Sequence, residues 1–238
     1  MLVRISHINV ELENISPSVI ELMKPFAAEG TPDFSVSIQP GDIESEREWY
    51  ADMLEKKGIK NVIVPELHLE MSVLRRKVRS RTPLFGALGI HGSAIAVDGM
   101  AYVFTANSGT GKSTHTRLWR EMLGEHAVMV NDDKPMLRVD DGITTVYGSP
   151  WTGKHKIGSN TQAPVRAICF LERSMDNWIR EIPRHEAFPD LFHAIFRPAD
   201  PVALARTMEL LEKMDVRYYR LGCNMEPEAA RVAYEGMR

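Results

Sequence analysis

The sequence predicts an α/β fold in two parts, a small N-terminal α/β unit over residues 1–82 and a larger α/β core over residues 83–238. Short apolar stretches and amphipathic stretches take turns along the chain, which indicates strands interspersed with helices. The composition changes near residue 84, where the largely apolar stretch LFGALGIHGSAIAV begins. A glycine-rich loop within residues 105–119 then joins an apolar strand to a helix, as is typical of α/β sheets.

Composition excludes several classes of protein. The 238 residues suffice for a sizeable core, and 44% are hydrophobic and 26% charged, as in ordinary globular proteins. A net charge of −3 gives no general attraction to nucleic acid or to an anionic membrane. The two cysteines, Cys169 and Cys223, are too few for a disulfide framework or a cysteine-rich zinc site, and Cys169 is expected to be buried. Without a long apolar run or a signal peptide, we expect a cytoplasmic location.

The elements of the N-terminal unit follow from periodicity and from proline. Alternation with period two marks strands, and apolar residues at helical spacing, such as Leu67, Met71, Leu74 and Val78, mark a helix that Pro83 ends. The predicted elements are a strand over 3–12, a helix starting at Ser16-Pro17, a strand over 34–39 that ends at Pro40-Gly41, and a helix over 65–83.

A basic run lies on the last of these helices and comprises Arg75, Arg76, Lys77, Arg79 and Arg81. Such a run is either a solvated helix face or a docking site for phosphate or a partner. Nucleic-acid binding is the weaker interpretation, because the net charge is negative and no aromatic residues interleave with the basic ones.

In the core, Asp-Gly pairs mark hairpin turns and prolines separate or begin helices. The expected elements are a strand pair over 84–106 turned at Asp98-Gly99, a helix over 112–123, a strand over 126–133, a hairpin over 136–148 turned at Asp141-Gly142, strands over 165–173 and 177–184, helices over 185–196 and 200–214, a strand over 217–223 and a helix over 226–238.

The glycine-rich loop fits the phosphate-loop pattern G-x-x-x-x-G-K-[ST], except that Ala106 replaces the first glycine. Glycines at this spacing let backbone N–H groups approach phosphate oxygens, and the following helix adds a partial positive charge. Lys112 can reach the β- and γ-phosphates, and the Ser113 hydroxyl can hold Mg²⁺. The alternative is a glycine-rich turn that only caps a helix. The expected ATP-binding residues are Asn107, Ser108, Gly109, Thr110, Gly111, Lys112, Ser113 and Thr114.

A pair of carboxylates ends the next apolar strand, in the stretch VMVNDDKP. Strand ends and loop ends gather on one edge of an α/β sheet, so Asp132 and Asp133 are expected near the phosphate loop. One carboxylate can hold Mg²⁺ while the other faces an acceptor hydroxyl. The alternative is an exposed turn.

Two further features have both a functional and a structural interpretation. His91 lies in an otherwise apolar run and is either a core histidine or part of the site. The stretch YGSPWTGKHKIG, residues 147–158, contains Trp151, Lys154 and His155. It can close over phosphates or substrate, or form a surface loop held by a buried tryptophan.

In this order, HGSAIAVDG, NSGTGKST and VNDDKP resemble the C-terminal kinase domain of HPr kinase/phosphorylase, within the HPr kinase and phosphoenolpyruvate carboxykinase superfamily. The resemblance covers roughly residues 84–225 and implies a P-loop kinase core. It implies that His91 lies near the transferred phosphate and that Asp132 is the general base. It further implies that Lys112 binds phosphate, and that Ser113 and Asp133 hold the metal ion.

The sequence also departs from that family. Thr114 stands where HPr kinase has an acidic residue, and residues 147–158 stand where the family has a Leu-Glu-Ile-Arg-Gly-Leu-Gly run. The resemblance therefore implies neither HPr as the substrate nor the phosphorylase activity. HPr kinases assemble as oligomers, so an oligomer is compatible with it.

The expected function is Mg²⁺-dependent transfer of the γ-phosphoryl group of ATP to a hydroxyl, either of a small molecule or of a peptide serine. Asp132 takes the proton, and Lys112 and Lys154 stabilise the transferred group. The competing hypothesis is a sensor or scaffold that binds ATP and transfers nothing.

Overall fold

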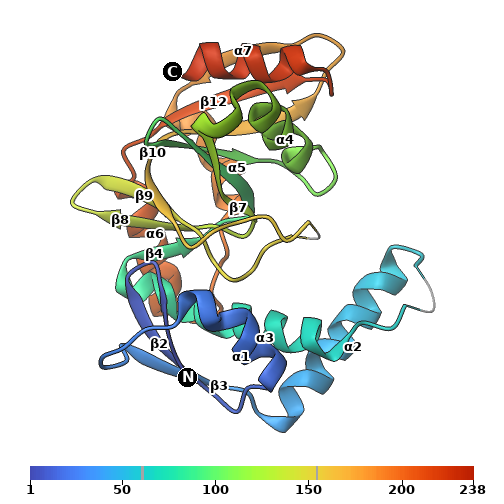
Figure 1. Ribbon diagram of the computed structural model, residues 1–238, viewed down its shortest axis with the longest axis vertical. Helices are drawn as coiled ribbons and strands as arrows, with labels where there is room; N and C mark the ends of the chain where they lie inside the picture. The colour runs from blue at the N-terminus through green and yellow to red at the C-terminus, as the bar shows by residue number, and fades with distance from the viewer. Residues whose placement is uncertain (60–61, 154) are drawn as a thin grey trace.

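The computed structural model describes residues 1–59, 62–153 and 155–238 (Figure 1). Its described residues form a mixed α/β fold with a three-stranded sheet and a nine-stranded sheet. The helices are α1 (Pro17–Met23), α2 (Pro40–Lys56), α3 (Glu66–Arg81), α4 (Lys112–Leu123), α5 (Arg184–Ala194), α6 (Pro201–Lys213) and α7 (Pro227–Met237), with short 3₁₀ helices at Lys24–Phe26, Thr82–Phe85 and Gly124–His126. No helix in the described ranges combines the length and apolar composition needed to cross a membrane.

The small sheet is N-terminal and has the order β1-β2-β3. Its strands are β1 (Leu2–Ile5), β2 (Ile8–Glu13) and β3 (Phe34–Ser37). The prediction of one strand over 3–12 is wrong, because Ser6 and His7 both have positive φ, 53° and 62°, and turn the chain into an antiparallel hairpin. β3 then runs parallel to β2.

Helix α2 was not predicted, because Pro40-Gly41 looked like the end of a strand. Proline suits the first turn of a helix, where its missing N–H needs no partner. The Gln39 backbone N–H donates to Asp42 at 2.7 Å, which satisfies another free group at the helix start. Glu46 is the only buried residue of α2, so the sequence has no apolar stripe here that would predict a helix.

The large sheet has the order β4-β8-β9-β10-β6-β5-β7, and β12 pairs with both β10 and β11. Its strands are β4 (Ala87–Gly89), β5 (Gly92–Val97), β6 (Met100–Thr105), β7 (Ala127–Asp133), β8 (Met136–Asp140), β9 (Ile143–Tyr147), β10 (Gln162–Arg173), β11 (Trp178–Ile182) and β12 (Arg217–Cys223). β10 pairs antiparallel with β9 at its start and parallel with β6 and β12 further along, so the sheet is mixed and curls along this long strand.

Several predicted elements of the core are confirmed. The β5–β6 and β8–β9 hairpins turn at Asp98-Gly99 and Asp141-Gly142, where all four residues have positive φ. The predicted helix over 112–123 matches α4. β4 is an exception, because it pairs with β8 and is not part of the β5–β6 hairpin.

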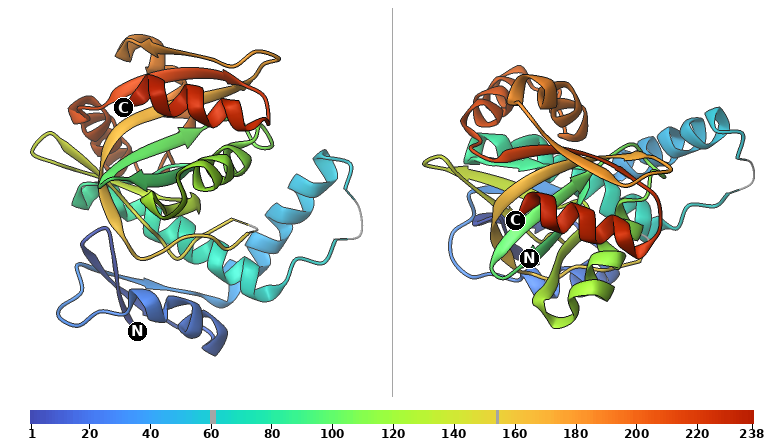
Figure 2. Two further views of the ribbon diagram at one scale, coloured as in Figure 1. Left: turned by 45° about the horizontal axis from the view of Figure 1, so that its top comes forward. Right: turned by 90° about the horizontal axis from the view of Figure 1, so that it is seen from above.

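Helices cover both faces of the large sheet. α4 and α7 pack on one face and α5 and α6 on the other (Figure 2). Trp119 of α4 is fully buried there beside Phe104 and Tyr102 of the sheet. Cys169 is buried in the same cluster, as expected, and it forms no disulfide.

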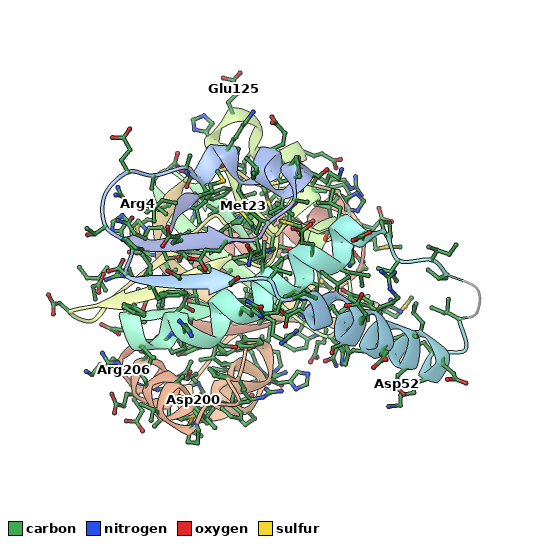
Figure 3. All side chains as sticks on the ribbon, turned by 90° about the horizontal axis from the view of Figure 1, so that it is seen from below. Arg4, Met23, Asp52, Glu125, Asp200 and Arg206 are labelled. Carbon is green, nitrogen blue, oxygen red and sulfur yellow. The ribbon has the colours of Figure 1, made fainter. Side chains whose placement is uncertain are left out.

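A third hydrophobic cluster joins the N-terminal sheet to the core. It combines Val73 and Val78 of α3 with Met136, Tyr147 and Trp151 from the other side of the predicted boundary. The division at 82/83 stays a prediction. Figure 3 shows α2 and α3 along the underside of the molecule, with Asp52 of α2 near one edge.

The outward half of the basic run holds α3 in place. Lys77 pairs with Asp42 of α2 at 2.5 Å, and Arg76 pairs with Glu46 at 3.1 Å. Arg81 donates to the Ser35 carbonyl of β3 at 3.2 Å. These cations therefore have a structural role within the N-terminal region.

Candidate active site

The glycine-rich loop connects β6, in the middle of the large sheet, to the N-terminus of α4. Gly109 and Gly111 have φ values of +80° and +127°, which strain any residue with a side chain. Among the described residues, no atom beyond the chain neighbours lies within 4 Å of a Cβ built on either glycine, so the space beside the loop is open to this part of the chain. Arg173, at the end of β10, donates to the Gly109 carbonyl at 2.7 Å and steadies the loop.

Lys112 is the first residue of α4, and its side chain folds back over the loop. It is 8% exposed, and its Nζ donates to the Ala106 carbonyl at 3.0 Å. Burial lowers the pKa of Lys112, against the opposing effect of Asp133 and Asp132. The ammonium forms no ion pair with a described residue, so its charge is available to a bound anion.

Asp132 lies near the end of β7 and is 2% exposed. Its Oδ1 accepts hydrogen bonds from the Ser113 hydroxyl at 2.9 Å and from the Ser93 hydroxyl at 2.5 Å. Oδ2 accepts none from a described residue. The structure therefore brings the loop hydroxyl and the first aspartate together. Ser93 was missed, because its place opposite Asp132 depends on the β5–β7 register.

Asp133 follows with a positive φ of 105°, which turns its side chain to a different set of partners. Its Oδ1 lies 3.1 Å from His91 Nε2, and its Oδ2 lies 2.8 Å from Lys134 Nζ. Burial alone raises the pKa of Asp133, but the His91 hydrogen bond and the Lys134 charge bring it well below its ordinary value. Asp133 is thus a stable anion with both oxygens engaged.

The two partners of Asp133 differ in charge. The hydrogen bond to Asp133 raises the pKa of His91, but burial and the charges of Lys134 and Lys112 outweigh it and leave the pKa below its usual 6.5. His91 is therefore mainly neutral at pH 7, and its Nε2–H donates to the carboxylate. Burial lowers the pKa of Lys134 to about 8. Lys134 was missed, because the sequence places it in a turn.

Arg79 of α3 is a buried member of the basic run and lies close enough to Asp133 to feel its charge. It is 5% exposed, lies 4.9 Å from the centroid of the Phe196 ring and occupies the space that a Cβ at Gly89 would need. Its buried Nε has no hydrogen-bond partner in the described part of the chain. Burial lowers the pKa of Arg79 to about 9, and the charge of Asp133 opposes this shift.

Residues 148–153 and 155–158 form a strap that lies along the end of β7. Trp151 is buried in the N-terminal cluster, as the surface-loop interpretation requires. Gly153 N donates to the Asp132 carbonyl at 2.7 Å, and Asp132 N donates to the Ile157 carbonyl at 3.0 Å. His155 is exposed beside the site. The predicted catalytic Lys154 lies outside the described residues.

A cavity of about 220 Å³ opens beside Asp132, between α4, β7 and the strap. Its polar lining includes Ser113, Thr114, Arg117, Arg120 and His155. Asp133 and His91 are not among the lining residues, so the two aspartates face different surroundings.

The oxygen donors at this place fit Mg²⁺, although no cluster of three or more His, Cys, Asp or Glu side chains suited to a metal occurs among the described residues. Mg²⁺ needs no such cluster, because it binds one or two carboxylates together with substrate phosphates. The Ser113 hydroxyl and the neighbouring carboxylate are hard oxygen ligands of that kind.

Comparisons with known proteins give distant structural likenesses. No family model matches the chain, and no curated protein matches it. Among solved structures, the HPr(Ser) kinase/phosphatase from Coxiella burnetii is similar with a TM-score of 0.39 and 12% identity, over 62% of this chain and 94% of that one. A likeness this distant bears on neither the activity nor the site residues of this chain.

Proposed function

We propose that the protein is a phosphotransferase that moves the γ-phosphoryl group of ATP to the hydroxyl of an acceptor. The observation that carries the proposal is the 2.9 Å contact between Ser113 and Asp132, beside the buried Lys112 and at the wall of a cavity. A phosphate-binding loop alone fits a sensor equally well. A carboxylate held between that loop and a cavity supports transfer.

The phosphates of ATP bind along residues 107–114, where the loop amides, the α4 N-terminus and Lys112 supply positive charge. In the transfer step the acceptor oxygen forms a bond to the γ-phosphorus while the bond from that phosphorus to the β–γ bridging oxygen breaks. The acceptor hydroxyl proton passes to Asp132. Neutral His91 lies on the same edge of the sheet, near the place of the transferred group, and its Nε2–H orients the Asp133 carboxylate.

Asp132 suits the role of base better than Asp133 does. It lines the cavity, and its Oδ2 accepts no hydrogen bond from a described residue. Asp133 has both oxygens engaged by His91 and Lys134. Mg²⁺ would be held by Ser113 with Asp133, as the sequence predicts, or with Asp132, which the Ser113 contact favours. When bound, it would neutralise charge on the phosphates.

A transfer assay tests the proposal. The protein is incubated with γ-labelled ATP, Mg²⁺ and a cell extract divided into small-molecule and protein fractions, in parallel with the Asp132→Asn variant. We expect labelled product in one fraction with the intact aspartate and none with the variant. If ATP binds but no label is transferred to either fraction, the sensor hypothesis replaces this one.

A further inference from the structure

The cavity beside Asp132 follows one face of α4. The wall of the cavity that α4 forms consists of residues spaced three or four apart, which lie on the same side of an α-helix. The strand β7 and the strap form the opposite wall. The lining residues on α4 are Ser113, Thr114, Thr116, Arg117 and Arg120, and those facing them are Met129, Asp132, His155 and Ile157.

The two arginines on this lining differ in whether they form an ion pair. Arg117 is offset by Glu121, which lies 2.6 Å away on the next turn of α4. Arg120 forms no ion pair with a residue of the described ranges, and its Nε is buried without a hydrogen-bond partner. A desolvated guanidinium donor without an acceptor costs free energy. A carboxylate or phosphate group would supply acceptors in the planar geometry that arginine favours.

Arg120 is too far along the helix to belong to the ATP phosphate site. Arg120 lies seven positions after Ser113, which corresponds to about 10 Å of helix rise. Arg120 and Asp132 nevertheless line the same cavity, one from α4 and the other from β7. A compound with its hydroxyl at Asp132 can therefore place a second group at Arg120.

The volume limits the size of that compound. Sites for drug-sized ligands usually measure about 300–1,000 Å³. A cavity of about 220 Å³ fits a smaller molecule, and a folded protein domain would present its serine from outside.

We infer that the acceptor is a metabolite-sized alcohol that carries an anionic group, either a carboxylate or a phosphate, and that Arg120 binds this group. The inference rests on the proposed phosphotransferase function and adds the class of acceptor to it. Arg117 and His155 lie beside the anionic group as further donors.

Anion exchange separates the candidates before the acceptor is known. A deproteinised cell extract is divided into an anion-exchange flow-through and a retained fraction, and each is incubated with γ-labelled ATP, Mg²⁺ and the protein. A protein fraction is assayed in parallel. We expect label to enter a product made from the retained fraction. Elution with increasing salt before and after phosphatase treatment of the extract distinguishes a carboxylate from a phosphate.

The Arg120→Gln variant tests the residue. At limiting retained fraction we expect its transfer rate to fall about 10- to 100-fold, as for the loss of a charged hydrogen bond, while its affinity for ATP stays unchanged. With the isolated acceptor, KM should rise and kcat should change little, and Arg120→Lys should restore part of the loss. Arg206→Gln is the matched control, because Arg206 is a helix-surface arginine on α6 paired with Glu209.

Product from the flow-through or the protein fraction alone, or equal rates for Arg120→Gln and the control, would overturn the inference and leave the transfer function intact. No product from any fraction would overturn the proposed function together with the inference. Because the fractionation result needs only the unchanged protein, the inference stays open to refutation even if Arg120→Gln fails to fold.

Discussion

The N-terminal region differs in the pairing of its buried charges from the proposed catalytic edge, which is the edge of the large sheet that carries Lys112, Asp132 and Asp133. In the N-terminal region, buried Glu46 accepts from the Ser72 hydroxyl at 2.6 Å and from Arg76 at 3.1 Å. Buried Glu70 of the same region accepts from the Ser16 backbone at 2.7 Å. At the catalytic edge, Lys112 and Arg79 are buried cations that form no ion pair with a described residue.

This difference separates charges that are paired within the fold from buried charges that form no ion pair with a described residue. Helix α3 shows both on one element, because Arg76 and Lys77 pair with α2 while Arg79 lies unpaired near Asp133. A basic run in a sequence therefore has no single meaning. The neighbours that each side chain meets decide its role.

The largest expected effect is on turnover at the catalytic edge. Asp132→Asn should lower kcat about 10²- to 10⁴-fold, since an amide cannot accept the acceptor proton. ATP affinity should stay nearly unchanged. Labelled-product assays and ATP titration measure the two quantities, and Asp190→Asn, at an exposed carboxylate paired with Arg220, is the control. Turnover equal to that of the control would remove Asp132 from the mechanism.

The same substitution at the next residue distinguishes the two carboxylates. If Asp133 holds the metal ion, Asp133→Asn should raise the Mg²⁺ concentration needed for half-maximal transfer about tenfold or more. Replacing a residue that binds or supports a metal ion typically lowers the metal affinity by this factor. Magnesium titrations of both variants measure this. A shift in Asp132→Asn alone would assign the metal to Asp132 and Ser113.

In the N-terminal region the effect should appear in stability. Glu46→Ala leaves the buried Ser72 hydroxyl and Arg76 without their acceptor and should lower the free energy of unfolding by about 2–4 kcal/mol. Activity per folded molecule should not change. Urea denaturation measures the loss, and exposed Glu44→Ala on the same helix is the control. Equal stability of the two variants would contradict the structural role given to Glu46.

Arg79 should behave in the opposite way. Arg79→Met removes a buried charge that forms no ion pair with a described residue and keeps an apolar chain of similar length beside Phe196, so the free energy of unfolding should rise by about 1–3 kcal/mol. The same urea experiment applies. A clear loss of stability would show that Arg79 is compensated within the fold.

The smallest effect is expected at the loop support. Arg173→Gln removes the hydrogen bond to the Gly109 carbonyl and should weaken ATP binding by about fivefold, the value of one ordinary hydrogen bond. ATP titration measures it, with exposed Arg231→Gln on α7 as the control. An unchanged affinity would mean that the loop keeps its shape without Arg173.

The sequence predicts the elements of the core better than those of the N-terminal region. The loop and helix from Ala106 to Leu123 carry their own local signals in glycine and in helical spacing. The turn at Ser6-His7 and the start of α2 at Pro40 do not, because the turn lacks the Asn-Gly or Asp-Gly pair typical of hairpins and α2 has no apolar stripe. The order of strands in the large sheet depends on long-range packing and cannot be read from any local window.

The residues of the candidate site likewise fall into those that a local motif predicts and those that long-range packing places. Motif spacing was enough to expect Ser113 and Asp132 on one edge of the sheet, and the structure brings them into contact. Ser93, Arg79 and Arg120 gain their places from strand register and from the rotation of helices, which leave no motif. Ser93 and Arg120 lie in stretches of ordinary composition, and nothing in the basic run distinguishes Arg79 from its neighbours.

Calorimetric titration with ATP and Mg²⁺ tests the central claim most directly. The account predicts saturable binding at one site per chain, weakened at least about tenfold by Lys112→Ala, since that substitution removes a charged contact to phosphate. No binding to the unchanged protein, or equal affinity in the variant, would contradict the claim that this loop and its buried lysine hold the phosphates of ATP.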